Sequence, residues 1–288
     1  MSWRIHTGDC LRLMRDLPSH TVAAVITDPP YSSGGAMRSD RMATTGRKYT
    51  QGGTLTHRAD FAGDNRDQMS YGYWSTLWLS ECLRVTKPGG ACLVFTDWRQ
   101  LSVTINALQA GGWIWRGIIP WDKTESARPD KGRFRNQCEY VVWGSKGPLG
   151  VAPPQAPCLP GLVRVRVRRS DKHHIAGKPT DLMRALVRIA WQGGTILDPF
   201  CGSGTTGVAA IAESLDFVGY ELIPIYAEQA RARCAAAVAA MTNTTATINA
   251  TNASNLVNPS AESHHPAKTD LINAAKTEST IRNAGCER

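Results

Sequence analysis

Short apolar runs alternate with longer segments of helical spacing along the first 240 residues. Residues 21–28 (TVAAVITD) and 91–97 (ACLVFTD) are nearly uninterrupted apolar runs, whereas residues 71–87 and 179–194 repeat apolar side chains at helical spacing. Continuous apolar strands indicate a parallel sheet buried on both faces, and the intervening helices supply its cover. We therefore predict a doubly wound α/β domain over residues 1–240.

The same reasoning locates the remaining elements. The helix at 71–87 should stop at Pro88-Gly89-Gly90, because proline and glycine disfavour a continued helix. We expect further strands at 3–10, 113–123, 137–146, 195–198 and 217–222, and helices at 11–18, 99–110, from 205 and from 224.

Three stretches lack this periodicity. Residues 32–70 form a long basic insertion, and residues 145–178 contain the run VRVRVRR, whose arginines would share one face of an extended strand, either to hold phosphates or to protect a sheet edge. Residues 241–288 are rich in Thr, Asn, Ala and Ser and contain no aromatic residue. Such a segment buries too little apolar surface to offset its ordering entropy, so we expect it to be mostly disordered.

Charge and cysteine usage narrow the class of protein. The 288-residue chain has a formal net charge of +9, which favours a polyanionic partner such as nucleic acid. Its eight cysteines include no C-x-x-C pair, and the sequence has no apolar signal region and no membrane-length apolar stretch. We therefore expect a reduced, cytoplasmic protein with no metal site.

Residues 28–31 read Asp-Pro-Pro-Tyr and end the predicted strand at 21–28. Proline fixes its own φ and pushes the preceding residue toward extended geometry. The segment should therefore be a stiff loop that holds carbonyl and carboxylate acceptors beside an aromatic ring.

Residues 195–207 (TILDPFCGSGTTG) predict a strand, a glycine turn and the start of a helix. Glycine permits a tight turn and a close approach of the backbone to a ligand, at the carboxyl edge of the sheet. Glu221 closes the next predicted strand, where a carboxylate can accept hydrogen bonds from ribose hydroxyls, and Asp198 could pair with a ligand ammonium. A structural glycine turn is the alternative, since the spacing fits neither the dinucleotide fingerprint nor a P-loop.

The two motifs together, DPPY at 28–31 and DPFCGSGTT at 198–206, resemble the beta group of DNA amino-methyltransferases, in which the catalytic block precedes the cofactor block. The resemblance covers about residues 1–235. It implies a circularly permuted, mostly parallel, seven-stranded Rossmann-like sheet, S-adenosyl-L-methionine as methyl donor and double-stranded DNA as partner.

The resemblance also implies roles for individual residues. The Asp28 carboxylate and the Pro29 carbonyl would accept the two N–H groups of an exocyclic amine, Pro30 would keep the loop rigid, and Tyr31 would stack on the flipped base. The cofactor would be held by Asp9, Cys10, Lys178, Asp198, Pro199, Phe200, Gly202, Gly204, Thr205, Thr206, Glu221 and Leu222. The target base or the DNA backbone would be contacted by Phe134, Asn136, Arg38, Arg41, Arg47, Lys48, Arg133, Arg135, Arg164, Arg166 and Arg168.

The sequence departs from the family pattern before the helix at 179–194. The usual His-Pro-Thr-Gln-Lys-Pro is His-Ile-Ala-Gly-Lys-Pro at 174–179, so Lys178 and Pro179 match and the preceding contacts do not. The gap that normally holds the target-recognition region, residues 145–178, is short. Recognition of the DNA target sequence would then be relaxed, or it would be carried out by the insertion at 32–70.

Several functions remain open at this stage. Asp at the first catalytic position goes with adenine N6 in this family and Ser with cytosine N4, so we expect an adenine enzyme and keep cytosine N4 as the alternative. An RNA methyltransferase and a DNA-binding protein without activity are more remote. The recognition sequence, a homodimer and a companion restriction nuclease are left undecided.

Overall fold

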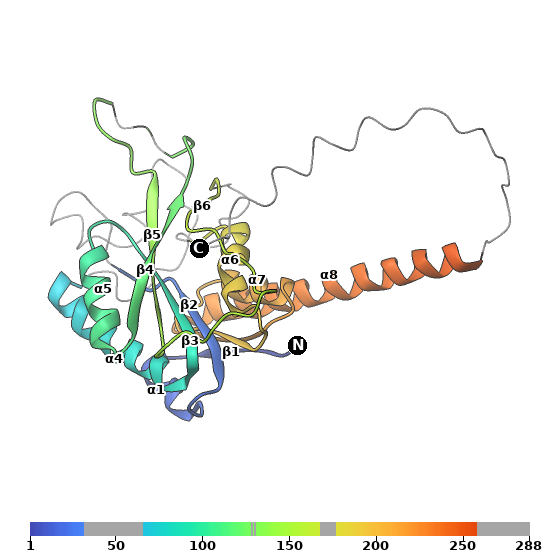
Figure 1. The fold of residues 1–288 in the computed structure, drawn as a ribbon, viewed down its shortest axis with the longest axis horizontal. Helices are drawn as coiled ribbons and strands as arrows, with labels where there is room; N and C mark the ends of the chain where they lie inside the picture. Colours follow the sequence, from blue (N-terminus) through green and yellow to red (C-terminus); the bar gives the residue numbers. More distant parts are fainter. Residues whose placement is uncertain (32–65, 128, 130, 168–176, 258–288) are drawn as a thin grey trace. The chain divides into compact units, whose positions relative to one another are not determined.

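The computed structural model of the chain describes residues 1–31, 66–127, 129, 131–167 and 177–257 (Figure 1). Residues 1–240 form one compact unit, and residues 241–288 are grouped separately. The compact unit is built on one sheet with the strand order β1-β8-β7-β2-β3-β5-β4-β6. Its strands are β1 (Trp3–Thr7), β2 (Val22–Thr27), β3 (Thr86–Thr96), β4 (Ile114–Asp122), β5 (Cys138–Ser145), β6 (Val163–Arg164), β7 (Thr195–Asp198) and β8 (Asp216–Glu221).

The sheet is mostly parallel, as the apolar runs predicted. Strands β1, β8, β7, β2 and β3 pair in parallel, and β5 runs antiparallel to both β3 and β4. The described chain has eight strands rather than the expected seven, because the two-residue strand β6 adds to the edge of β4 at Trp121 and Asp122. The run VRVRVRR therefore forms a strand only at Val163–Arg164, within the residues that the structure describes.

Helices cover both faces of this sheet (Figure 1). One face carries α1 (Cys10–Leu13), the 3-10 turn Met14–Asp16, α4 (Gln68–Val85) and α5 (Leu101–Ala110). The other face carries α6 (Thr180–Val187), the 3-10 turn Arg188–Ala190, α7 (Thr205–Ala212) and the first turns of α8 (Pro224–Val257). This arrangement confirms the doubly wound α/β fold.

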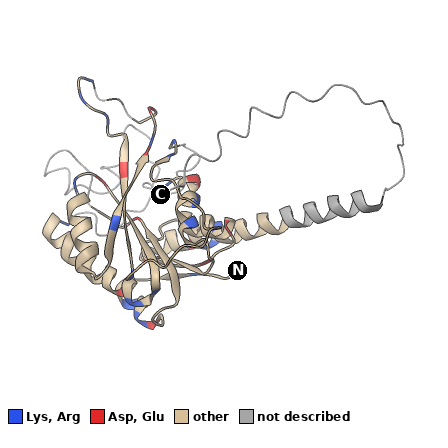
Figure 2. Cartoon of the chain, viewed as in Figure 1, with Lys and Arg blue, Asp and Glu red and all other residues tan. Residues whose placement is uncertain are grey.

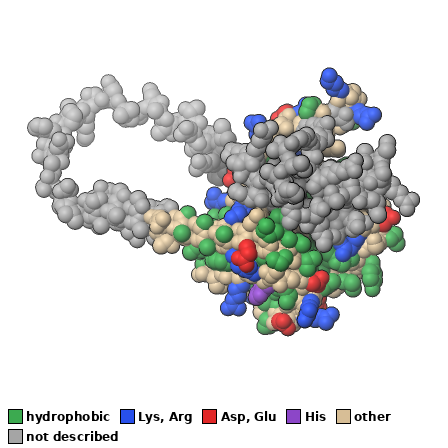
Figure 3. All heavy atoms as spheres, turned by 180° about the vertical axis from the view of Figure 1, so that it is seen from behind, with side chains coloured by type: hydrophobic (Ala, Val, Ile, Leu, Met, Phe, Trp, Pro, Cys, Tyr) green, Lys and Arg blue, Asp and Glu red, His purple; other side chains and the backbone are tan. Residues whose placement is uncertain are grey.

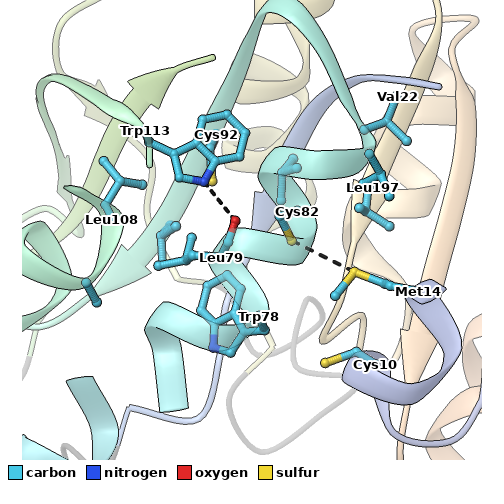
Figure 4. Close-up of a cluster of buried hydrophobic side chains, with 14 of the residues drawn as sticks. Cys10, Met14, Val22, Trp78, Leu79, Cys82, Cys92, Leu108, Trp113 and Leu197 are labelled. Atoms are coloured by element: carbon cyan, nitrogen blue, oxygen red, sulfur yellow. Dashed lines mark hydrogen bonds between the residues drawn. The ribbon is translucent and has the colours of Figure 1, made fainter. Parts of the chain in front are cut away.

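The core between α4 and the sheet is continuous with α1 and α5 (Figure 4). Trp78, Leu79 and Cys82 lie on one side of α4 and are fully buried, because their spacing puts them on one helical face. The Trp113 indole donates to the Leu79 carbonyl at 3.0 Å, which satisfies a buried polar group that would otherwise weaken the core.

Helix α4 ends at Val85, before the expected stop at Pro88-Gly89-Gly90. Thr86 already begins strand β3, where it pairs with Val22. The Thr86 hydroxyl donates a hydrogen bond to the Cys82 carbonyl at 2.7 Å, which satisfies one of the last carbonyls of the helix. Lys146 Nζ donates to the carbonyls of Leu83, Arg84 and Thr86, so the end of the helix is satisfied without the glycines.

Helix α8 continues to Val257, although we expected disorder from residue 241. Residues 224–240 contain eight alanines, which have the highest helix propensity, whereas residues 241–257 contain three alanines among threonines and asparagines of lower propensity. The helix therefore continues from an alanine-rich first half into a stretch that has no proline or glycine to end it before residue 258. Residues 258–288 lie outside the described residues.

In the part of the chain that the structure describes, no helix is both long and apolar enough to cross a membrane.

Candidate active site

The two sequence motifs meet at the carboxyl ends of neighbouring strands. Strands β2 and β7 pair in parallel, with Ala24 opposite Ile196 and Val25 opposite Leu197. Residues 28–31 follow β2 and residues 199–204 follow β7, so two segments 170 residues apart leave the sheet side by side. From β2 the chain crosses to β3, and from β7 it crosses to β8 in the opposite direction. The site is therefore a topological switch point, where ligands bind in open α/β sheets.

One pocket at this edge brings together nearly all of the predicted catalytic and cofactor residues. Asp28, Pro29, Pro30 and Tyr31 line one part, and the loop after β7 lines another. The other predicted residues that line it are Asp9, Cys10, Lys178, Asp198, Pro199, Phe200, Gly202, Thr205, Thr206, Glu221 and Leu222. Gly204 is the predicted cofactor residue that does not line it.

The glycine loop has backbone geometry that side chains resist. Gly202 and Gly204 have φ values of 51° and 83°. A Cβ on Gly204 would lie 2.8 Å from Ala230 Cβ on α8, whereas one on Gly202 would meet no atom within 4 Å. Gly204 is thus required for helix packing, and Gly202 leaves the backbone open toward the pocket.

Asp198 is held by other groups of the chain. Its carboxylate accepts from the Thr27 hydroxyl at 2.7 Å, from the Thr206 hydroxyl at 2.5 Å and from the Phe200 amide at 3.1 Å. The side chain is only 2% exposed, and burial raises its pKa to about 6 despite these hydrogen bonds. Asp198 therefore fastens the ends of β2 and β7 to the start of α7, and its contact with a ligand ammonium stays a prediction.

Glu221 lies at the end of β8 beside the glycine loop. Its carboxylate accepts from the Gly202 amide and from the Ile223 amide, each at 2.9 Å. Burial raises its pKa, while these backbone hydrogen bonds act in the opposite direction. Asp9, at the start of α1, shares this end of the pocket and accepts from the Arg12 amide.

Aromatic rings of α4 pack against Phe200, and both Trp74 and Phe200 line the pocket. Phe200 lies 5.3 Å from Trp74 and 5.2 Å from Trp78, centroid to centroid. The Arg66 guanidinium stands 4.1 Å from the centre of the Trp74 ring, at the rim of the same pocket. Burial lowers the Arg66 pKa, and the nearby Asp9 opposes that change.

Lys178 connects the catalytic loop to a further carboxylate. Its Nζ donates to the Asp28 carboxylate at 2.5 Å and lies 3.4 Å from Glu139 Oε2, at the start of β5. The Tyr31 hydroxyl donates to the same Oε2 at 3.3 Å, and Lys123 donates to Oε1 at 3.3 Å. The Lys178 ammonium also lies 5.2 Å from the Phe95 ring centre.

These buried charges stabilise one another. Burial alone would lower the Lys178 pKa, but Asp28 and Glu139 outweigh it and the pKa is raised. Burial alone would raise the Glu139 pKa, but Lys178 and Lys123 outweigh it and the pKa is lowered. Both shifts favour the charged form, so Lys178 and Glu139 are held as an ion pair at neutral pH.

Glu139, Lys123, Trp74 and Arg66 were missed by the sequence reasoning. Glu139 was hidden because it begins a strand that reads as buried, and only the antiparallel pairing of β5 turns its first residues toward this edge. Trp74 precedes Trp78 by four residues on α4, so the spacing of these two aromatics was a visible signal that their rings lie on one helical face.

The predicted DNA-contacting residues lie outside the pocket, where the structure describes them. Arg133, Phe134, Arg135 and Asn136 are exposed in the loop between β4 and β5. Arg164 contacts Glu125 at 2.7 Å and Asp122 at 3.4 Å, and Arg166 is exposed. Arg38, Arg41, Arg47, Lys48 and Arg168 lie outside the described residues.

Comparisons with known proteins also indicate a DNA methylase. The DNA methylase family of N6/N4 methyltransferases matches residues 22–151 and 160–232. YubD of Escherichia coli (strain K12) is 28% identical over 239 residues, which are 83% of this chain and 92% of that protein. The type II methyltransferase M.HinfI of Haemophilus influenzae is 26% identical over 249 residues, 78% of this chain and 66% of that protein.

Solved structures support the fold. The M1.HpyAVI–SAM complex has a TM-score of 0.58 at 21% identity, over 80% of this chain and 98% of that chain. The cytosine-N4-specific PvuII DNA methyltransferase has a TM-score of 0.62 at 18% identity, over 81% of this chain and 86% of that chain. With its family match covering most of residues 22–232 and both motifs in one pocket, the chain belongs to the N6/N4 DNA methylase family.

Proposed function

We propose that this DNA methyltransferase methylates the exocyclic N6 of adenine in duplex DNA, with S-adenosylmethionine as its methyl donor. The observation that carries the proposal is one pocket in which the Asp28–Tyr31 loop faces the glycine loop and Glu221. A base-binding acceptor array and a nucleoside-binding crevice thus share one cavity.

The pocket has the chemistry to hold S-adenosylmethionine. Glu221 is placed for ribose hydroxyls, Phe200 offers an apolar face for the adenine, and Asp9 adds a second acceptor at the same end. Gly202 leaves the loop backbone free of a side chain on the pocket side. When bound, S-adenosylmethionine supplies an electrophilic methyl group on a positively charged sulfur.

The DPPY loop would prepare the target amine. An exocyclic amine is a poor nucleophile because its lone pair is delocalised into the ring. Acceptors on both N–H groups, the Asp28 carboxylate and the Pro29 carbonyl, draw the lone pair back onto nitrogen and stabilise the positive charge that grows there. Asp28 would also receive the proton that the nitrogen loses once the new N–C bond has formed.

Asp28 favours adenine over cytosine. In this family an acid at the first catalytic position accompanies adenine N6, and a serine accompanies cytosine N4. Cytosine N4 is the second candidate, because PvuII methyltransferase, which has the same fold, is cytosine-N4-specific.

The target base would have to leave the duplex to reach this pocket, at a cost of about a few kcal/mol in stacking and pairing. Tyr31 would stack on the flipped base. Lys and Arg follow the projecting loop between β4 and β5 (Figure 2) and stand out from the surface at the top of Figure 3. These side chains include Lys131, Arg133 and Arg135, which we propose contact phosphates together with the predicted Arg166.

The test is methyl transfer from S-adenosylmethionine to unmethylated duplex DNA, followed by digestion to nucleosides and mass spectrometry. We expect N6-methyladenine, and Asp28→Ala should lower its rate of formation by at least about 100-fold, since it removes a charge-stabilising acceptor. Asp16→Ala is the matched control, because Asp16 is exposed and does not line the pocket.

Other products would redirect the proposal. N4-methylcytosine would keep the mechanism and overturn the choice of base. No modified DNA, together with methylated RNA under the same conditions, would overturn DNA as the substrate.

A further inference from the structure

The four-charge cluster at the DPPY loop holds one carboxylate that no motif accounts for. Glu139 is the second residue of strand β5, whereas Asp28 follows β2, and β3 lies between these two strands. Its two oxygens contact three different side chains: Lys123 on Oε1, and Lys178 and Tyr31 on Oε2. A single side chain thus connects the catalytic acid, through Lys178, with the ring expected to stack on the base.

Lys178 poses an electrostatic problem for the proposed reaction. Its ammonium lies 2.5 Å from the Asp28 carboxylate, and only 8% of its side chain is exposed. A buried positive charge beside the acceptor opposes the positive charge that develops on the target nitrogen. A second buried carboxylate next to the ammonium removes most of that opposition.

Glu139 is placed to supply this balance. Its Oε2 lies 3.4 Å from Lys178 Nζ, and 20% of the Glu139 side chain is exposed. Lys123 completes the charge balance from the end of β4. The charged groups that act on the cluster from neighbouring elements are Asp97 after β3 and Asp198 after β7, both acidic.

Building on the proposed function, we infer that Glu139 is a positioning residue for methyl transfer. It holds Lys178 against Asp28 and Tyr31 toward the target base, and its carboxylate offsets the Lys178 charge, which would otherwise oppose the positive charge that grows on the amine. Lys178 acts in this arrangement on the catalytic loop, beyond the cofactor contact expected from its motif.

Glu139→Gln is the informative variant, because it keeps the shape of the side chain and removes only its charge. Lys178 would keep Asp28 as its one carboxylate partner, and the cluster would carry a net positive charge. We expect the single-turnover rate constant of transfer to fall about 10- to 100-fold at pH 7, comparable to the loss of a partner that orients a functional side chain. Affinity for S-adenosylmethionine should change less than about twofold, because Glu139 does not line the cofactor end.

The pH profile separates this role from simple support of the fold. Removing one carboxylate lowers the Lys178 pKa, so the ammonium of the variant loses its proton at lower pH than that of the parent. As pH rises from 7 toward 10, the rate of Glu139→Gln relative to the parent should therefore rise. Glu139→Asp, which keeps the charge, should recover part of the rate at pH 7.

Two controls complete the experiment. Glu81→Gln removes a carboxylate from the ion pair with Arg84 on α4, away from the pocket, and should give a relative rate near one at every pH. Tyr31→Phe removes the contact with Glu139 without changing charge, so its relative rate should stay flat with pH.

A relative rate for Glu139→Gln that stays flat with pH would overturn the inference, as would a loss explained entirely by weaker cofactor binding. If the parent itself transfers no methyl group to DNA, the proposed function fails and the inference fails with it. An active parent with a flat profile overturns the inference alone.

Discussion

At the scale of the residue, the acid most easily assigned to ligand binding has a structural task. Asp198 opens the glycine loop in the sequence, yet it is nearly fully buried and accepts three hydrogen bonds from the chain. The unfolded carboxyl ionises near pH 4, whereas burial raises the folded pKa to about 6. The folded state therefore holds this proton more tightly, and the stability it contributes below pH 4 is lost as pH rises through 6, by roughly 3 kcal/mol.

Thr27→Val tests this assignment. The substitution removes a hydroxyl that donates to Asp198 at 2.7 Å, and a hydrogen bond to a charged group contributes about 1.5–3 kcal/mol. We expect the free energy of unfolding in urea to fall by about that amount at pH 7.5, and by less at pH 4.5, where the carboxyl is protonated. Thr76→Val, whose hydroxyl donates to a neutral helix carbonyl, should show no such pH dependence. An equal penalty at both pH values would mean that Thr27 does not support the ionised carboxylate.

The sequence identified motif residues far better than their partners. The stiff loop at Asp28–Tyr31 was predicted from four consecutive residues, because proline fixes the local backbone, and the roles of Asp28 and Tyr31 were implied by the family resemblance. Glu139 is 108 residues away from Tyr31, and their contact exists only because β5 turns back antiparallel beside β3. A side chain whose role depends on strand pairing leaves no local pattern to find.

At the scale of the element, the loop between β7 and α7 depends on its fit against α8. Gly204 has φ 83°, and its missing Cβ makes room for Ala230. Arg233, one turn further along α8, donates to the Ser203 carbonyl at 2.7 Å and to the Thr205 hydroxyl at 3.2 Å. The helix thus holds the loop from behind, while Gly202 faces the pocket.

Gly204→Ala should accordingly be more harmful than Gly202→Ala. The left-handed backbone costs about 1–2 kcal/mol for a residue with a Cβ, and overpacking against Ala230 adds about 1–3 kcal/mol. We expect Gly202→Ala to carry only the first penalty in thermal or urea unfolding, since nothing lies within 4 Å. Gly150→Ala, at a position with open space and no positive φ, is the neutral reference. Equal losses for the two loop variants would show that α8 does not constrain the loop.

Element boundaries were harder to predict than element types. The helix at α4 was expected to run to Pro88, but strand pairing of Thr86 with Val22 ended it at Val85. The helix after Pro224 was expected, yet it continues to Val257, because no proline or glycine follows Pro224 before that residue. A tertiary interaction set the first boundary. The second follows from the absence of a helix breaker, which an argument from composition about burial does not consider.

At the scale of the whole molecule, the pocket follows from strand order. Residues 28–31 and 198–206 are far apart in sequence, and their union was expected only through the family resemblance. The pairing of β2 with β7 gives the physical reason, because two parallel neighbours deliver their loops to the same edge. A permuted chain order leaves that edge unchanged.

Part of the chain's positive charge lies in the loop between β4 and β5. This loop begins at the carboxyl end of β4, which is the edge of the sheet where the pocket lies. Lys131 and Arg133 are exposed there, beside a fully exposed Phe134. Arg135 is partly engaged by the Glu125 carbonyl, so it is less free to bind phosphate. Lys131 and Arg133 are therefore the clearest test of DNA contact by this loop.

We expect the double substitution Lys131→Ala, Arg133→Ala to weaken binding of duplex DNA uniformly across sequences. If both side chains neutralise phosphates, the slope of log affinity against log salt should become less negative by about 0.9 for each, because fewer counterions are released. Fluorescence anisotropy with a labelled duplex at several salt concentrations measures this slope, and affinity for S-adenosylmethionine should not change. Lys87→Ala removes one equal charge at the start of β3, the opposite edge of the sheet, and should leave the slope as it is. An unchanged slope in the double variant would place the DNA on another surface, since an exposed charge farther from a phosphate than the Debye length, about 8–10 Å at physiological salt, is largely screened.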